Sequence, residues 1–280
     1  MAPHVRQTAP RSLRLAPTGV AALGLLAACT GPIDPGSIAP TAAPTMAVTA
    51  TATPVLAATL SPVVEPSEST TGPYREIALD LPNGSQREGR DYGDGDVGIV
   101  LTHMGGISDS QEDWAALAEE LVAAGFRVVT FNHDAQAVWV QVLAATEYLR
   151  EHGAKTVIAG GASLGAMASL RAAQEPGNQL SAVVWIAGVQ LGSGYAFGEE
   201  DVGAVGCPML FASGTEDEHG AADDAERLSE WAVAGELVLV ESALHGTDIL
   251  LEDTDAANSL RSSMFDFLDR VTAAPPAACG

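Results

Sequence analysis

Lys155-Thr-Val-Ile-Ala-Gly-Gly-Ala-Ser-Leu-Gly-Ala-Met167 is the stretch that decides the fold. It predicts a short buried strand over 156–159 and a helix from about 164 to 174. Gly161-Ala-Ser-Leu-Gly165, a G-x-S-x-G pattern, lies between them. At such a tight turn the serine hydroxyl is pushed out above the sheet, and side chains in place of the two glycines would collide. The alternative is a glycine-rich turn with an ordinary serine. Residues elsewhere in the chain that could activate Ser163 would distinguish the two interpretations.

Strands and helices alternate on both sides of this turn. Continuous apolar runs such as 97–102 are typical of strands buried on both faces. The alternation therefore predicts a mostly parallel central sheet covered by helices on both sides, a three-layer α/β sandwich. We expect further strands at 74–81, 127–132, 181–187, 208–213 and 236–241, and further helices at 138–152, 221–234, 259–271 and after a capping box at Ser110–Asp113. Segments 87–96 and 188–206 are expected to be irregular, and the second is too short for a large lid.

The N-terminal 28 residues have the pattern of a leader. Three arginines precede an apolar run that is too short to span a membrane. The run ends in Leu26-Ala-Ala-Cys29, which resembles the lipobox of bacterial lipoproteins. The resemblance implies that residues 1–28 are a signal peptide and that Cys29 is acylated, which would hold the protein on the outer face of the cell membrane. A cytosolic chain with an apolar start is the alternative.

The segment after Cys29 does not have the composition of a folded domain. Residues 30–73 are mostly Ala, Thr, Pro and Ser without a helical or strand period, so 29–73 are predicted to form a disordered tether. Residues 74–273 have the length of one domain, and 274–280 are expected to be a flexible tail. We expect a monomer.

The charge of the chain excludes some partners. The formal net charge is −23, and loss of the three leader arginines would make it −26. Such a chain repels nucleic acid and anionic lipid headgroups. We therefore expect no nucleic-acid partner, and contact with the membrane through the lipid anchor only.

The remaining cysteines are far apart. Cys207 opens a predicted strand and Cys279 lies in the tail. Two such cysteines do not make a disulfide framework, so Cys207 is predicted to be an inert core residue. No CxxC pair or His-x-His cluster indicates a metal site.

Two later loops carry residue types that activate a serine. Gly214-Thr-Glu-Asp217 follows the strand at 208–213, and His245 follows the strand at 236–241. The carboxyl ends of parallel strands meet at one edge of a sheet, so Ser163, an acid from the first loop and His245 are expected to lie together. The imidazole would take the serine proton, and the carboxylate would fix its tautomer. The other candidates for the acid are Glu216, Glu218 and Asp224, and the other candidate for the base is His219.

The order of serine, acid and histidine, each after its own strand, resembles the α/β-hydrolase superfamily over residues 97–271. It is similar in particular to the small, lid-less serine members related to dienelactone hydrolases. The resemblance implies that Asp217, at the family's Gly-x-x-Asp position, is the acid and that His245, followed by Gly246, is the base. It implies that Leu101-Thr-His-Met-Gly-Gly106 corresponds to the family's Leu-His-Gly-x-Gly-Gly loop. The N–H groups of Met104, with Gly105 one register away, and of Leu164 would then bind an oxyanion.

Three departures from that family stand out. Ser163 replaces the cysteine common in dienelactone-type members, Thr102-His103 replaces the His-Gly of the loop, and no Arg-Gly-x-Gly loop follows Asn132. His103 and His133 also end predicted strands near the site, and we expect them to line the pocket or lie on the surface.

These residues predict a serine hydrolase that cleaves an ester or related acyl bond of a small molecule through an acyl-enzyme, without a cofactor or metal. The alternative is a surface-anchored binding module that retains the fold but not the chemistry.

Overall fold

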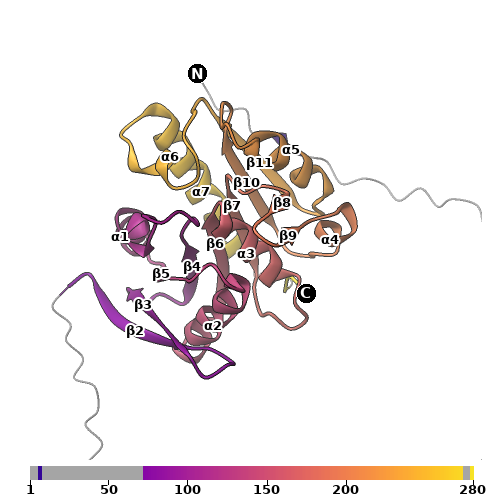
Figure 1. Cartoon of the computed structure of the whole chain (residues 1–280). Coiled ribbons are helices and arrows are strands. Elements are labelled where there is room, and N and C mark those ends of the chain that lie inside the picture. Colours follow the sequence, from indigo (N-terminus) through magenta and orange to yellow (C-terminus); the bar gives the residue numbers. More distant parts are fainter. Residues whose placement is uncertain (1–5, 8–71, 274–277) are drawn as a thin grey trace, which may run out of the picture. The chain divides into compact units, whose positions relative to one another are not determined.

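The computed structural model describes residues 6–7, 72–273 and 278–280. A nine-stranded sheet forms its centre, and six neighbouring strands of that sheet are parallel, in the order β11-β10-β7-β6-β4-β5 (Figure 1). Their bounds are β4 Val97–Thr102, β5 Arg127–Phe131, β6 Thr156–Ala162, β7 Ala182–Ile186, β10 Met209–Gly214 and β11 Gly235–Val240. The prediction of a mostly parallel central sheet is confirmed.

Helices cover both faces of this sheet because the strand side chains alternate between two apolar cores. In β6, Val157 and Ala159 belong to one core and Ile158 belongs to the other. Helices α2 and α3 lie in front of the central strands in Figure 1, and α7 lies partly behind them. The helices that cover the sheet are α1 Ala115–Ala123, α2 Val138–Glu151, α3 Leu164–Ala173, α5 Ala221–Trp231 and α7 Asp255–Ala273. The capping box predicted at Ser110 and Asp113 is present and starts the 3-10 turn η1, Gln111–Trp114, that leads into α1.

The segment predicted to be an irregular turn at 87–96 is instead largely a strand. β3, Gln86–Tyr92, pairs antiparallel with β2, Tyr74–Asp80, and with β5. The sequence did not predict this strand because it is rich in charged residues, one of which, Asp91, points into the protein. Arg127 donates two hydrogen bonds to Asp91, of 2.8 and 2.6 Å, and Arg75 and Tyr148 donate one each.

Burial opposes the charged form of Asp91, but the hydrogen bonds and charge of Arg127 hold the pKa of this carboxyl below its usual value. This ion network therefore links the antiparallel strands β2 and β3 to β5, the neighbouring strand of the parallel part of the sheet.

The predicted irregular loop at 188–206 also contains regular structure. It holds a small hairpin, β8 Leu191–Gly192 and β9 Tyr195–Ala196, and the short helix α4, Glu199–Gly203. A second short helix, α6 Asp248–Leu251, lies between β11 and α7 and was not predicted.

Cys207 and Cys279 form a disulfide across 72 positions of sequence, so the prediction of an inert Cys207 was wrong. Cys279 is buried, its N–H donates to the Leu180 carbonyl, and its own carbonyl accepts from Gly206. Residues 278–280 therefore lie against the domain, in contrast to the predicted flexible tail. The sequence distance concealed this pairing, because only the fold returns the chain beyond α7 to the start of β10.

Removal of this disulfide is expected to lower the free energy of unfolding by about 4 kcal/mol, because the bond joins residues that are 72 positions apart in the unfolded chain. Urea unfolding of wild type and of the double variant Cys207→Ala/Cys279→Ala measures the difference. A reductant should destabilise the wild type and leave the double variant unchanged. Equal stabilities of the two proteins would contradict the prediction.

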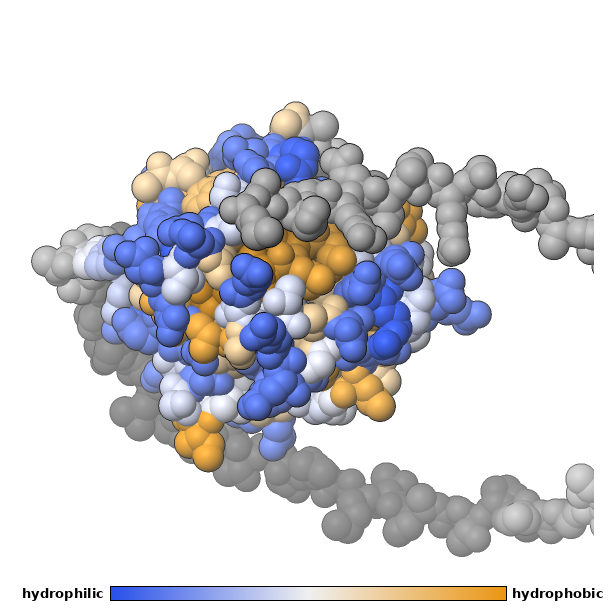
Figure 2. All heavy atoms as spheres, turned by 90° about the horizontal axis from the view of Figure 1, so that it is seen from above, coloured by the Kyte–Doolittle hydropathy of each residue, from blue (hydrophilic) through white to orange (hydrophobic). Residues whose placement is uncertain are grey.

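The predicted leader and tether lie almost wholly outside the described residues, and Cys29 lies outside them as well. The exception is β1, Arg6–Gln7, which pairs antiparallel with the outer edge of β11. A chain cleaved before Cys29 would lack this pairing. Among the described residues, no helix is both long and apolar enough to cross a bilayer. Hydrophilic residues cover most of the face in Figure 2, with apolar residues in smaller groups between them.

Candidate active site

Ser163 occupies the sharp turn between β6 and α3, as the sequence predicts. Its backbone has φ 49° and ψ −115°, a conformation that is unfavourable for a residue with a side chain. A side chain at Gly161 would collide with the backbone of Gly165, and one at Gly165 would collide with the Thr102 carbonyl. The Ser163 N–H donates a 2.9 Å hydrogen bond to the Ile186 carbonyl at the end of β7. The two glycines and this bond together hold the strained turn in place.

Asp217 and His245 are joined directly. The His245 Nδ1 and the Asp217 Oδ2 lie 2.7 Å apart, and the Asp217 side chain is completely buried. Backbone hydrogen bonds from Thr215 to Val240 and from Glu216 to Ser242 bring the two loops together. The loops after the neighbouring strands β10 and β11 thus bring the Asp217 carboxylate into contact with the His245 imidazole.

The competitors for these two roles occupy other positions. Glu216 and Glu218 are exposed, and the Asp224 carboxylate accepts hydrogen bonds from the Gln190 N–H and from Arg227. The ring of His219 lies 4.4 Å from that of His245, but the contact of this residue with Asp217 is made by its backbone N–H, at 2.9 Å from Oδ1. The geometry therefore pairs Asp217 with His245.

The histidine loop lies next to the serine turn. A side chain at Gly246 would collide with the thioether of Met104 and would come within 3.3 Å of the Ala162 methyl group. Gly246, the residue after His245, is therefore close to the residue that precedes Ser163. Within the described part of the chain, no hydrogen bond joins the Ser163 hydroxyl to His245, so proton transfer would require the two groups to approach each other.

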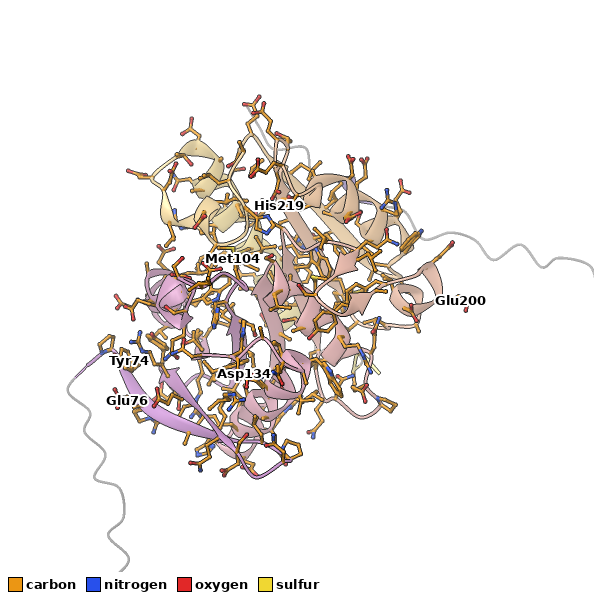
Figure 3. The ribbon with its side chains drawn as sticks, in the orientation of Figure 1. Tyr74, Glu76, Met104, Asp134, Glu200 and His219 are labelled. Atoms are coloured by element: carbon orange, nitrogen blue, oxygen red, sulfur yellow. A yellow bond between two sulfur atoms is a disulfide. The ribbon has the colours of Figure 1, made fainter. Side chains whose placement is uncertain are left out.

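Two backbone N–H groups, those of Met104 and Leu164, lie in segments that are in contact. A side chain at Gly105 would come within 3.0 Å of the Leu164 side chain, which places the loop after β4 against the start of α3. Figure 3 shows Met104 and His219 near each other above the central strands. Among the described residues, neither the Met104 N–H nor the Leu164 N–H has a hydrogen-bond acceptor. Both groups are available to an oxyanion, and the first N–H of a helix also carries its positive dipole end.

Comparison with solved structures agrees with this architecture. An esterase from Pyrococcus furiosus superimposes with a TM-score of 0.58 at 16% identity, covering 70% of this chain and 90% of its own. A thermophilic esterase from Thermogutta terrifontis gives 0.58 at 13% identity, covering 70% and 98%. A protein of unknown function from Staphylococcus aureus gives 0.60 at 12% identity, covering 70% and 99%.

The chain has the α/β-hydrolase fold. No family model and no curated protein sequence matches it, so the likeness to solved structures establishes the fold alone. Within that fold, the serine turn after β6, the acid after β10 and the histidine after β11 all lie at the carboxyl ends of the strands. The described residues contain no group of three or more His, Cys, Asp or Glu side chains that could hold a metal ion.

One feature of this α/β-hydrolase domain was not predicted. His103 and His133 follow neighbouring strands, β4 and β5, and their rings stack at 3.7 Å with an angle of 7° between the planes. His103 is only 4% exposed, so it does not lie on the surface. Burial lowers the pKa of both rings, and the neighbouring His133 helps to lower that of His103 to about 4. The signal in the sequence was a histidine directly after the end of one strand and a second close after the next, but only the pairing of those strands brings the two rings together.

The lowered pKa of His103 predicts a pH dependence of stability. Between the ordinary value of 6.5 and about 4, the unfolded chain binds a proton that the folded chain does not. The free energy of unfolding has its full value above pH 6.5 and is expected to fall by up to about 3 kcal/mol as the pH decreases from 6.5 towards 4. Urea unfolding of wild type and His103→Asn should give a stability difference that shrinks over this range, while contributions of the carboxylates cancel. A difference that is constant with pH would contradict the prediction.

Proposed function

We propose that the protein is a serine hydrolase that cleaves an ester or related acyl bond of a small molecule through an acyl-enzyme. The observation that carries the proposal is the buried Asp217–His245 hydrogen bond beside a serine held in a strained strand-to-helix turn. At an ordinary solvated surface, neither a buried carboxylate bonded to an imidazole nor an unfavourable backbone conformation at a serine would be expected. The esterases among the similar structures support the same reaction class.

In the proposed reaction the Ser163 hydroxyl oxygen attacks the carbonyl carbon while Nε2 of His245 takes the hydroxyl proton. Asp217 keeps the imidazole in the required tautomer and stabilises its positive charge. The N–H groups of Met104 and Leu164 bind the negative oxygen of the tetrahedral intermediate. The intermediate collapses when His245 gives its proton to the leaving alcohol.

Water then completes the cycle. His245 takes a proton from a water molecule, the resulting hydroxide attacks the acyl-enzyme, and the second tetrahedral intermediate releases the carboxylic acid as the proton returns to Ser163. Each proton that enters His245 leaves it again, so the cycle needs neither a cofactor nor a metal. Ser163, as an oxygen nucleophile in place of cysteine, is one of three features that distinguish the protein from the common dienelactone-type enzymes.

A fluorophosphonate probe tests the enzyme proposal against the alternative of a binding module. The folded wild-type domain should be labelled at Ser163 and should hydrolyse p-nitrophenyl esters, and a series of rising acyl length would define the preferred substrate. Folded protein that is neither labelled nor active would favour the binding module.

We further propose that the protein works outside the cytoplasm, anchored through an acylated Cys29. The lipobox-like sequence motivates this, and the Cys207–Cys279 disulfide supports it, because such bonds persist in oxidising compartments. In a bacterial host, Cys29→Ser should release the protein from the membrane fraction or leave the leader uncleaved. Normal processing with unchanged membrane retention would overturn the proposal.

A further inference from the structure

We propose that the stacked pair His103–His133 is a positioning device that fixes the oxyanion-binding backbone of the loop after β4. His133 holds the His103 carbonyl and His103 holds the Met104 carbonyl, so that the N–H groups on the other side of these peptides face Ser163. The inference rests on the proposed function, because it concerns how the same site binds an oxyanion. Neither histidine would touch the substrate.

The hydrogen bonds of the two rings define both tautomers. His103 Nδ1 lies 2.6 Å from the Met104 carbonyl oxygen, and its Nε2 lies 3.3 Å from the His133 backbone N–H. Nδ1 must therefore carry the proton and Nε2 must accept. His133 Nε2 lies 3.1 Å from the His103 carbonyl oxygen, and its Nδ1 lies 3.2 Å from the Ala135 N–H. In this ring Nε2 carries the proton and Nδ1 accepts, so all four nitrogens are satisfied only when both rings are neutral.

These bonds determine where the N–H groups of the loop point. The described residues contain no cis peptide bond, and in a trans peptide the C=O and the following N–H point in opposite directions. A His103 carbonyl directed at His133 therefore directs the Met104 N–H away from His133. In the same way, a Met104 carbonyl held by His103 directs the Gly105 N–H away from that ring. The arrangement resists rotation of either peptide, which would turn a carbonyl oxygen towards the oxyanion.

The need for such a device follows from the loop itself. Residues 105–108 are exposed, and a glycine pair, Gly105-Gly106, offers no side chain to fix the backbone. The backbone before the loop is also confined by the close approach of Gly165 to the carbonyls of Thr102 and His103. The imidazoles supply the missing constraint from within the protein.

The charged groups around the pair leave it neutral. Asp109, on the loop after β4, accepts a 2.6 Å hydrogen bond from the Gly106 N–H. Asp134, directly after His133, accepts from the Gln136 N–H and pairs with Arg87. Asp109 favours protonation of both rings and Asp134 favours protonation of His133, but burial outweighs them and lowers the pKa of each imidazole. The neutral forms that the hydrogen bonds require are therefore the forms present at neutral pH.

Isosteric amides test the device because they replace one ring nitrogen at a time. The amide nitrogen of Gln reaches the position of Nε2, and that of Asn reaches the position of Nδ1. At position 133, Gln can therefore keep the bond to the His103 carbonyl, whereas Asn cannot. At position 103 the relation is reversed, so that Asn can keep the bond to the Met104 carbonyl and Gln cannot.

We expect His133→Gln and His103→Asn to keep kcat for a p-nitrophenyl ester within about threefold of wild type. His133→Asn and His103→Gln should lower kcat by roughly 10- to 100-fold with little change in KM, since loss of a complete oxyanion donor costs about 10²- to 10³-fold. Urea midpoints of each pair establish that the two members are equally folded. If one Asn or Gln variant fails to fold, the pair at the other position decides.

The outcomes separate this inference from the proposed function. Equal kcat values for Asn and Gln at both positions, with hydrolysis still dependent on Ser163, would overturn the inference alone. The inference would also be overturned if the variants changed KM in place of kcat. The same holds if the loss of kcat followed the urea midpoint of each variant and not the ring nitrogen that the amide replaces. A wild-type protein without Ser163-dependent hydrolysis would overturn the proposed function.

Discussion

Ser163→Ala is expected to lower kcat for ester hydrolysis by about 10⁴- to 10⁶-fold, because the covalent route disappears with the hydroxyl. Residual turnover would reflect oxyanion binding and the His245–Asp217 pair acting on water. The alanine methyl group fits the half-buried position of the serine, and the backbone bond from residue 163 to Ile186 does not involve the side chain. Initial rates with p-nitrophenyl esters and labelling by a fluorophosphonate probe would both measure the loss.

The matched control is Ser193→Ala. Ser193 is an exposed serine that also has a positive φ, of 48°, but it lies in the β8–β9 turn. This variant should keep wild-type activity and labelling. A Ser163→Ala protein that retains more than a few per cent of the wild-type rate would show that another group is the nucleophile.

Asp217→Asn is expected to lower kcat by about 10⁴-fold with the fold preserved. The amide cannot stabilise an imidazolium, and its NH₂ group would favour the wrong tautomer of His245. The structure makes the prediction specific to one acid, since only Asp217 lies 2.7 Å from Nδ1 and is completely buried. kcat measured at fixed pH and ionic strength tests it.

Glu216→Gln and Glu218→Gln serve as controls for that prediction, because each removes one exposed negative charge beside Asp217. Both should change kcat by less than a few-fold, an effect that added salt would reduce. Comparable small losses in all three variants would mean that the enzyme works with a Ser163–His245 dyad and that Asp217 only orders the loop.

The serine turn could be predicted from sequence because its causes are local. A glycine on each side of Ser163 is required by contacts within a few residues, and an apolar strand followed by a helix is visible in the periodicity. The resemblance to the Gly-x-x-Asp pattern predicted Asp217 as the acid, and the backbone bonds from the loop after β10 to Val240 and Ser242 set the register that brings Asp217 and not Glu216 to His245.

The features that sequence did not predict depend on partners far along the chain. β3 was hidden because the charge of Asp91 is neutralised by Arg127, 36 positions away. The disulfide and the histidine pair were hidden for the same reason, since strand order decides which ends meet. The residue types indicated which side chains could take part in catalysis, and the strand order of the sheet determines which of them are in contact.

The Cys207–Cys279 bond has a further consequence for the unfolded chain. The segment that it closes, 207–279, contains Asp217 and His245 but not Ser163, so the denatured, unreduced polypeptide is a lariat with the proposed acid and base in the ring and the proposed nucleophile on the stem. A lariat is more compact than an open coil and exposes less new surface to denaturant. The oxidised protein should therefore unfold in urea with a shallower slope than the reduced one, and should migrate faster in a denaturing gel.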